Sequence, residues 1–171
     1  MRFSQIDRIT QLIDGQSLTA VKCLSLSEEY LQDHFPRCPL MPGVIMIEAM
    51  FQASMWLMRT TDLFQHPMVA LRGARNIRFR ELVEPGDPLT IETKLGKFDG
   101  DRAEFLASGS VHGETAVSGR LTLEQYFMHD RLDPAAVYEP YMLSEFKRKF
   151  RLLVRPDLEL SLPVRQSLGM A

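Results

Sequence analysis

The stretch of sequence that decides the fold is residues 34–57, which reads HFPRCPLMPGVIMIEAMFQASMWL. It opens with His34 in a proline-rich turn and continues into residues 44–61, which carry almost no charge. Glu48 is the acid set into the first half of that run. A helix without a polar face must be covered by protein on every side. The pattern therefore predicts one buried helix, with a histidine in the loop before it and a carboxylate inside it.

The residues around the start of this helix suit an acid/base site. Pro42 can occupy the first helical position, where its missing N–H is not needed. Gly43 lets a ligand approach the backbone, and its N–H at the helix N-terminus has no partner from a preceding turn. Gln52 lies one turn after Glu48 and can hydrogen-bond and orient it. An imidazole titrates near neutral pH, and apolar surroundings favour the neutral form of a carboxyl group.

The rest of the first 128 residues alternates with the period of β-strands. We expect strands over 5–13, 17–25, 68–80, 88–98, 102–112 and 114–126, joined by turns rich in Asp, Gly and Pro. Long antiparallel strands around one buried helix predict an α+β domain, in which a sheet wraps the helix.

The composition changes after residue 128, so we divide the chain into a domain over 1–128 and an extension over 129–171. Asp133-Pro134 is typical of a helix start. An apolar stripe then recurs every fourth residue, at Tyr138, Met142, Phe146 and Phe150. The tail over 156–171 lacks a period and is expected to be extended or loose.

Length and composition exclude several classes of protein. The formal net charge of -2 over 171 residues gives no case for nucleic-acid binding. Two cysteines make no disulfide framework, and together with the charged N-terminus they predict a cytoplasmic protein. The apolar run is too short for a membrane span and is interrupted by Glu48 and Gln52. His34 and Cys38 supply two metal ligands by spacing, which is too few for a site, so no metal is expected.

Residues 34–53 (HFPRCPLMPGVIMIEAMFQA) resemble the active-site motif of the 3-hydroxyacyl-[acyl-carrier-protein] dehydratases of fatty acid synthesis. Residues 74–80 and 83–87 resemble the third strand and following turn of that family, and the resemblance covers roughly 5–127. It implies a hot-dog fold, an antiparallel sheet around a long central helix, here with a C-terminal helix added. Arg37 and Cys38 stand where the family usually has a small residue and a second histidine.

The resemblance also implies an activity, the dehydration of (3R)-3-hydroxyacyl-[acyl-carrier-protein] to the trans-2-enoyl product. His34 maps to the catalytic base and Glu48 to the catalytic acid, each working with its counterpart from the other subunit of a homodimer. Three dimers can form a hexamer in the family. Gly43 is the expected donor to the thioester oxygen, and Gln52 the residue that orients the acid.

The substrate implied by the resemblance is an acyl chain on the phosphopantetheine arm of acyl carrier protein, without any further cofactor. Apolar residues near the motif are candidates for an acyl tunnel, with core packing as the other reading: Phe35, Met41, Phe51, Met55, Ile77 and Phe79. Basic residues are candidates for docking the acidic carrier protein, with a solvated surface as the other reading: Arg37, Arg78 and Arg80.

Two other functions remain open at this point. A hot-dog thioesterase also uses a carboxylate in the helix, but it has no need for His34. A non-catalytic subunit that binds acyl groups or carrier protein would retain the fold without turnover. Arg37 and Cys38 keep that reading open, since they could block or reshape the entrance. Acyl chain length, pathway and isomerase activity are not determined by the sequence.

Overall fold

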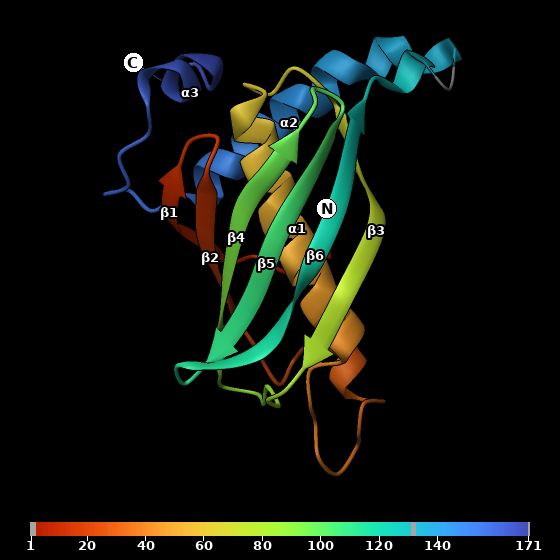
Figure 1. Cartoon of the computed structure of the whole chain (residues 1–171), viewed down its shortest axis with the longest axis vertical. Helices are drawn as coiled ribbons and strands as arrows, with labels where there is room; N and C mark the ends of the chain where they lie inside the picture. Colours follow the sequence, from red (N-terminus) through yellow and green to blue (C-terminus); the bar gives the residue numbers. More distant parts are fainter. Residues whose placement is uncertain (1–2, 131–132, 171) are drawn as a thin grey trace.

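The computed structural model describes residues 3–130 and 133–170. Over these residues six strands form one antiparallel sheet in the order β1-β2-β4-β5-β6-β3. Figure 1 shows this sheet lying across the long helix α1 (Gly43–Thr61). The arrangement confirms the predicted α+β architecture. The strands are β1 (Arg8–Ile13), β2 (Ser17–Cys23), β3 (Met68–Phe79), β4 (Pro88–Phe98), β5 (Arg102–Val111) and β6 (Glu114–Tyr126).

The first two strands are shorter than predicted, whereas the other four end within one residue of the predicted limits. β1 begins at Arg8 because Gln5, three residues earlier, donates its backbone N–H to the Gln52 side chain rather than to a strand. β2 ends at Cys23, and the N–H of Leu24 turns to the carbonyl of Asp87 at 3.0 Å. Both differences come from contacts between segments that are distant in sequence.

Helix α1 is buried all round over its C-terminal half only. Every residue from Gln52 to Thr60 is buried, including the polar ones. In the N-terminal half, Val44 is 70% exposed, and Ile45, Ile47 and Phe51 are half-buried. The sheet covers one face of the whole helix, so the uncovered apolar surface lies beside the first two turns. That end of the helix carries Glu48.

The C-terminal half of α1 is covered by the predicted C-terminal helix, α2 (Glu139–Leu153). The Trp56 ring lies 5.7 Å from the Phe150 ring and 6.5 Å from the Phe146 ring, measured between centroids. Phe64, just after α1, lies 5.4 Å from Phe150. The guanidinium of Arg59 sits 3.9 Å above the Phe146 ring. The predicted apolar stripe is therefore confirmed over its last two turns, where it meets α1.

The start of this helix was predicted wrongly. A 3-10 helix, η3, spans Asp133–Tyr138, and the α-helix begins only at Glu139. The reason is Pro140, which lacks an N–H and is tolerated only in the first turn of an α-helix. An α-helix that ran on from residue 133 would have placed Pro140 in its interior. The short 3-10 helices η1 (Glu29–Leu31) and η2 (Met128–Asp130) precede the His34 loop and η3 respectively.

The prediction of a loose tail was also wrong. Residues 154 and 155 run beside β1, where the N–H of Arg155 donates to the carbonyl of Ile9 at 3.2 Å. A further helix, α3 (Leu162–Ser167), buries Val164, and Leu168 just after it is buried as well. Arg151 on α2 donates to the carbonyl of Leu168. The tail is held by tertiary contacts that leave no periodic pattern in so short a segment.

Strand β3 forms one edge of the sheet. Its inner side pairs with β6, and within the described part of the chain no strand lies on its outer side. The register shifts twice along this pair, and Asn76 has a left-handed backbone with a φ of 54°. Phe79 at the end of β3 is 52% exposed. Long edge strands with exposed apolar residues readily pair with another chain.

No helix in residues 3–130 and 133–170 is long and apolar enough to cross a membrane.

Candidate active site

His34 is fixed by two hydrogen bonds to the same residue. Its Nδ1 lies 3.0 Å from the carbonyl oxygen of Leu40, and the Leu40 N–H donates to the His34 carbonyl at 3.0 Å. Since a carbonyl oxygen only accepts, Nδ1 must carry the hydrogen. In the neutral ring Nε2 is then the unprotonated nitrogen, which can accept a proton.

The tip of the His34 loop is a tight turn. The Cys38 N–H donates to the Phe35 carbonyl at 3.0 Å, and the peptide bond between His34 and Phe35 is cis. Phe35 is 55% exposed, and its ring centroid lies 4.4 Å from that of His34. Arg37 and Cys38, which depart from the family motif, are both exposed at this tip. Neither side chain is therefore packed into the interior of the protein.

Glu48 and Gln52 form the predicted contact on α1. The Gln52 Nε2 donates to Glu48 Oε1 at 2.7 Å. Glu48 is half-buried, whereas Gln52 is fully buried. The interaction joins residues four apart, which lie on the same face of a helix. Gln52 therefore holds one carboxyl oxygen of Glu48, and the carboxyl group lies on the uncovered half of α1.

The start of α1 is packed against the end of β3. A Cβ atom on Gly43 would lie 2.8 Å from Cε1 of Phe79, so any larger residue there would have to displace the Phe79 ring. Pro42 does not occupy the first helical position as predicted. It precedes the helix with an extended backbone, and its carbonyl accepts the N–H groups of Ile45 and Met46. The Gly43 N–H lies in the first turn, where the helix offers no acceptor and the helix dipole favours negative charge.

The candidate tunnel residues fall into two groups. Phe35, Phe79 and the half-buried Phe51 and Ile77 lie on surfaces that are partly open. Ile77 packs across Gly119, where a Cβ would lie 2.3 Å from its Cδ1. Met41 and Met55 are buried in the core instead. Met55 and Gln52 also line a small cavity of about 80 Å³ beneath Phe146 of α2.

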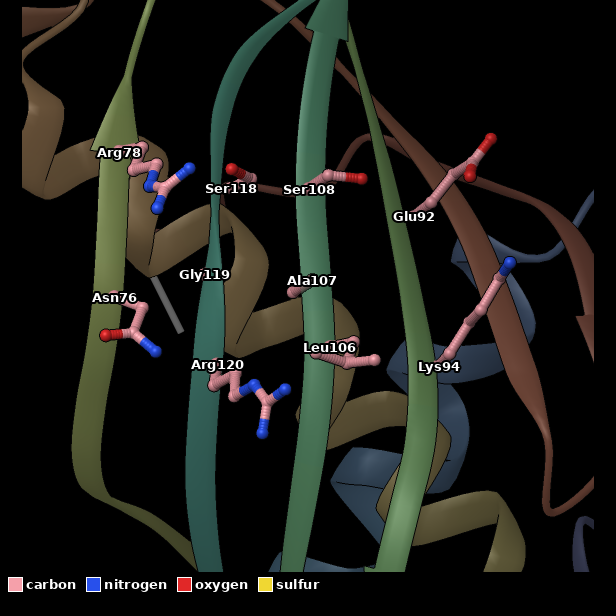
Figure 2. Close-up of a pocket in the computed structure, with 10 residues that line it drawn as sticks. All are labelled: Asn76, Arg78, Glu92, Lys94, Leu106, Ala107, Ser108, Ser118, Gly119 and Arg120. Carbon is pink, nitrogen blue, oxygen red and sulfur yellow. The ribbon is translucent and has the colours of Figure 1, made fainter.

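The candidate docking arginines are divided between two places. Arg37 is at the tip of the His34 loop, whereas Arg78 lies on the outer face of the sheet, away from α1 (Figure 2). There it lines a hollow of about 410 Å³ with Arg120 and Lys94, over a floor of small residues from β5 and β6. The exposed Arg80 follows the end of β3, where its N–H donates to the Ala116 carbonyl at 2.8 Å.

Several groups that shape the site could not be found from the sequence. The Leu40 carbonyl holds His34, and the backbone of Phe3 and Gln5 holds Gln52. These are main-chain groups, which leave no residue signature. Within the described residues no hydrogen bond or ion pair joins His34 to Glu48, and no cluster of three or more His, Cys, Asp or Glu side chains has the geometry of a metal site.

The family model of the FabA-like domain matches residues 1–124. A 3-hydroxyacyl-[acyl-carrier-protein] dehydratase FabZ from Oenococcus oeni is 35% identical over 116 residues, which are 68% of this chain and 84% of that protein. The protein of the same name from Caldicellulosiruptor bescii is 34% identical over 119 residues, which are 70% of this chain and 85% of that protein. The resemblance carried by residues 34–53 is thereby confirmed.

Solved structures support the fold. The dehydratase heterocomplex ApeI:P from Xenorhabdus doucetiae aligns with a TM-score of 0.64 at 20% identity, over 78% of this chain and 90% of that chain. The Escherichia coli PaaI protein of the phenylacetic acid degradation operon aligns with a TM-score of 0.53 at 10% identity, over 69% and 78% respectively. These alignments confirm the hot-dog fold. On the extent of the family match and the identity to its relatives, the chain belongs to the FabA-like domain family.

Proposed function

We propose that this protein dehydrates (3R)-3-hydroxyacyl-[acyl-carrier-protein] to the trans-2-enoyl thioester in fatty acid or related lipid synthesis. The observation that carries the proposal is that hydrogen bonds suit two side chains to opposite roles, one as a base and one as an acid. His34 presents an unprotonated Nε2 because Nδ1 donates to Leu40, and Glu48 presents one oxygen because the other accepts from Gln52. The family's named relatives are dehydratases of this substrate class.

The chemistry follows from these roles. His34 Nε2 takes a proton from C2 of the acyl chain, and the electron pair moves to form the C2–C3 double bond. The C3–O bond breaks, and Glu48 donates its proton to the departing hydroxyl, which leaves as water. The Gly43 N–H stabilises the negative charge that develops on the thioester oxygen. Transfer of the proton from His34 back to Glu48 through solvent restores both groups, so no cofactor is required.

We propose that the active unit is a homodimer joined through β3. This strand forms one edge of the sheet, and the exposed Phe79 at its end lies against Gly43, where the uncovered first half of α1 begins. A second copy that extends the sheet would cover that surface. It would also bring His34 of one subunit to Glu48 of the other, as the family resemblance implies. A trimer of dimers remains the proposed larger assembly.

Further parts of the proposal concern the partner and the domains. Acyl carrier protein is acidic, so Arg37 at the loop tip and Arg78 and Arg80 near the end of β3 are its proposed docking residues. The open apolar residues Phe35, Phe51, Ile77 and Phe79 are the proposed tunnel lining. Residues 1–128 would carry the chemistry and 129–171 would support α1. The proposed location is the cytoplasm.

Hydration of a crotonyl or longer enoyl thioester, the reverse reaction, tests the catalytic assignment. We expect His34→Ala and Glu48→Gln each to lower kcat by about 10²–10⁴-fold, the usual contribution of a general acid or base. His112→Ala, which alters an exposed histidine, is the matched control and should retain activity. Retained turnover in both variants would contradict the proposal. Release of free thiol from acyl carrier protein would instead indicate a thioesterase, and tight binding without turnover a non-catalytic subunit.

Mixing the two inactive variants tests the shared site. A heterodimer of His34→Ala and Glu48→Gln contains one site with both groups intact and one with neither. Random exchange of subunits should therefore restore about a quarter of the wild-type activity, because half of the dimers are mixed and each has one working site. Sites built within one subunit would give no recovery at all.

A further inference from the structure

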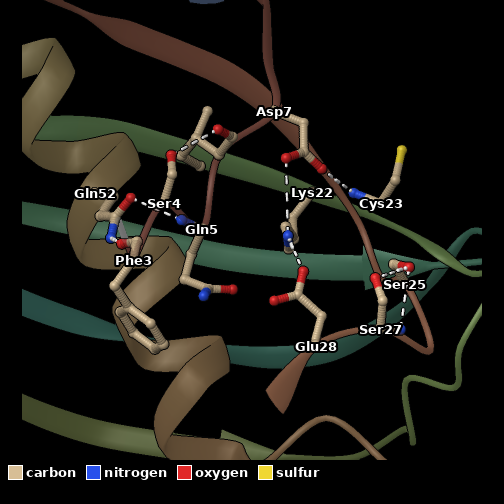
Figure 3. Close-up of polar contacts among 11 residues, drawn as sticks. Phe3, Ser4, Gln5, Asp7, Lys22, Cys23, Ser25, Ser27, Glu28 and Gln52 are labelled. Atoms are coloured by element: carbon tan, nitrogen blue, oxygen red, sulfur yellow. Dashed lines mark hydrogen bonds and ion pairs between the residues drawn. The ribbon is translucent and has the colours of Figure 1, made fainter. Parts of the chain in front are cut away.

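The N-terminal segment before β1 lies along helix α1 and contacts Gln52 through its main chain (Figure 3). The Gln5 N–H donates to Gln52 Oε1 at 2.9 Å, and Gln52 Nε2 donates to the Phe3 carbonyl at 3.0 Å. The same Nε2 donates its other hydrogen to Glu48 Oε1 at 2.7 Å. All three polar groups of the Gln52 amide are therefore used.

These contacts permit only one orientation of the Gln52 amide. A backbone N–H only donates and a backbone carbonyl only accepts. Turning the amide over would set its NH₂ group against the Gln5 N–H and its oxygen against the Phe3 carbonyl, inside a buried site where unpaired polar groups are costly. Gln52 must therefore always offer an N–H to Glu48, whatever the state of the carboxyl group.

We propose that the main chain of residues 3–5 is a positioning element for the catalytic acid. A carbonyl oxygen is a better acceptor than the oxygen of a C–OH group, so the N–H of Gln52 on Oε1 favours the neutral acid that carries its proton on Oε2. Within the described residues no hydrogen bond reaches Oε2, so that oxygen is available to the departing hydroxyl. The inference rests on the proposed dehydratase function and adds to it the part of the chain that selects the proton-bearing atom.

The segment is itself held firmly enough to act in this way. Ile6 is buried, and the Asp7 N–H donates to the Val21 carbonyl at 2.9 Å. The Asp7 carboxylate accepts the Cys23 N–H at 2.7 Å. Lys22, almost fully buried, pairs with both Asp7 and Glu28, as Figure 3 shows. The acid on α1 is thus connected through the N-terminal segment to strand β2.

A further contact links this segment to the approach to His34. The Phe3 ring packs edge-on against the Tyr30 ring of η1, with 6.5 Å between centroids. Burial raises the pKa of Tyr30 far above its ordinary value, with the nearby carboxylates of Glu28 and Asp7 adding to the rise, so the ring stays neutral. The segment therefore lies between the helix that carries the acid and the turn that leads to the base.

A pair of substitutions at one position separates the main-chain contact from the side chain. Gln5→Ala keeps the N–H that Gln52 accepts, whereas Gln5→Pro removes both the side chain and that N–H. In enoyl-thioester hydration we expect Gln5→Ala to keep kcat within about twofold and Gln5→Pro to lower it about tenfold with KM unchanged. A tenfold loss corresponds to about 1.4 kcal/mol, the low end for weakening a hydrogen bond to a charged group.

Combining each substitution with Gln52→Met shows whether the effect passes through Gln52. We expect Gln52→Met to lower kcat by itself, and Gln5→Pro to add less than about twofold in that background, because coupled residues are non-additive. An equal loss from Gln5→Pro in both backgrounds would mean general disruption and would overturn the inference. So would a Gln5→Pro variant as active as Gln5→Ala.

A measurement on the unmodified protein applies even if Gln5→Pro does not fold. The two Gln52 side-chain N–H signals in an NMR spectrum should exchange slowly with solvent, because both hydrogens are bonded in a buried site. Fast exchange would overturn the inference. Failure of the underlying function is separate: the wild type and Gln5→Ala would then both lack turnover.

Discussion

Removing the Phe150 ring should loosen the C-terminal helix from the body of the protein. Phe150 is fully buried and packs between Trp56 and Phe64, which belong to α1 and the residues just after it. Truncation of a buried phenylalanine to alanine costs about 3–5 kcal/mol of unfolding free energy, from lost burial and the cavity left behind. Two aromatic neighbours place Phe150→Ala in the upper part of that range.

Urea denaturation followed by tryptophan fluorescence measures this cost, since Trp56 is the single tryptophan and contacts the substituted ring. Thermal unfolding should give a fall in Tm of roughly 10 °C for a chain of this size. Variants must be compared at one protein concentration, because the stability of the proposed dimer would depend on it. Leu152→Ala, on the same helix but 65% exposed, is the control and should change stability by less than about 0.5 kcal/mol. A loss below about 1 kcal/mol for Phe150→Ala would refute the packing argument.

Three other substitutions test separate contacts. Gly43→Ala should reduce both stability and hydratase activity by forcing Phe79 aside. The double variant with Phe79→Ala should recover part of the lost stability in thermal unfolding. No recovery would mean that the clash with Phe79 is not the cause of the loss. Arg59→Met should cost about 2–4 kcal/mol in urea titrations, because it leaves two loop carbonyls without their buried donor; a cost near zero would refute this. Burial alone would raise the Glu139 pKa, but hydrogen bonds from His129 lower it below its ordinary 4.5. The Glu139 carboxylate thus contributes stability that is complete above pH 4.5 and is lost as the pH falls through the lowered pKa. Glu139→Gln should therefore lower Tm at pH 6 and make little difference near pH 3. An equal difference at both pH values would contradict the pairing of Glu139 with His129.

The central helix could be predicted from its long apolar run after Pro42-Gly43, and the four long strands from their period of two. The C-terminal helix was predicted as an element, but its start was misplaced because the signal at Asp133-Pro134 outweighed Pro140. The tail was misjudged for a different reason. Val164 and Leu168 are ordered by contacts with distant parts of the chain, which no window of local sequence contains.

The candidate site, like the fold, could be predicted from the sequence only in part. The contact between Glu48 and Gln52 follows from helical spacing alone, so it was predictable. The orientation of Gln52 is set by main-chain groups of Phe3 and Gln5, which any residue type would supply. The place of Arg78 on the face opposite Ile77 follows from the alternation of neighbouring strand residues, whereas the hollow that it lines with Lys94 and Arg120 from other strands needed the structure.

The contact between α1 and α2 has a consequence for the synthesis of the chain on the ribosome. Phe64 and Phe150 are separated by roughly 90 residues, and chains grow at about 5–20 residues per second. The nascent protein therefore carries Trp56 and Phe64 uncovered for roughly 4–18 s before the helix that shields them is made. During that interval the growing sheet can already close over the other face of α1. The half-finished protein is then most exposed to aggregation or chaperone capture at the aromatic patch, and completion of α2 ends that exposure.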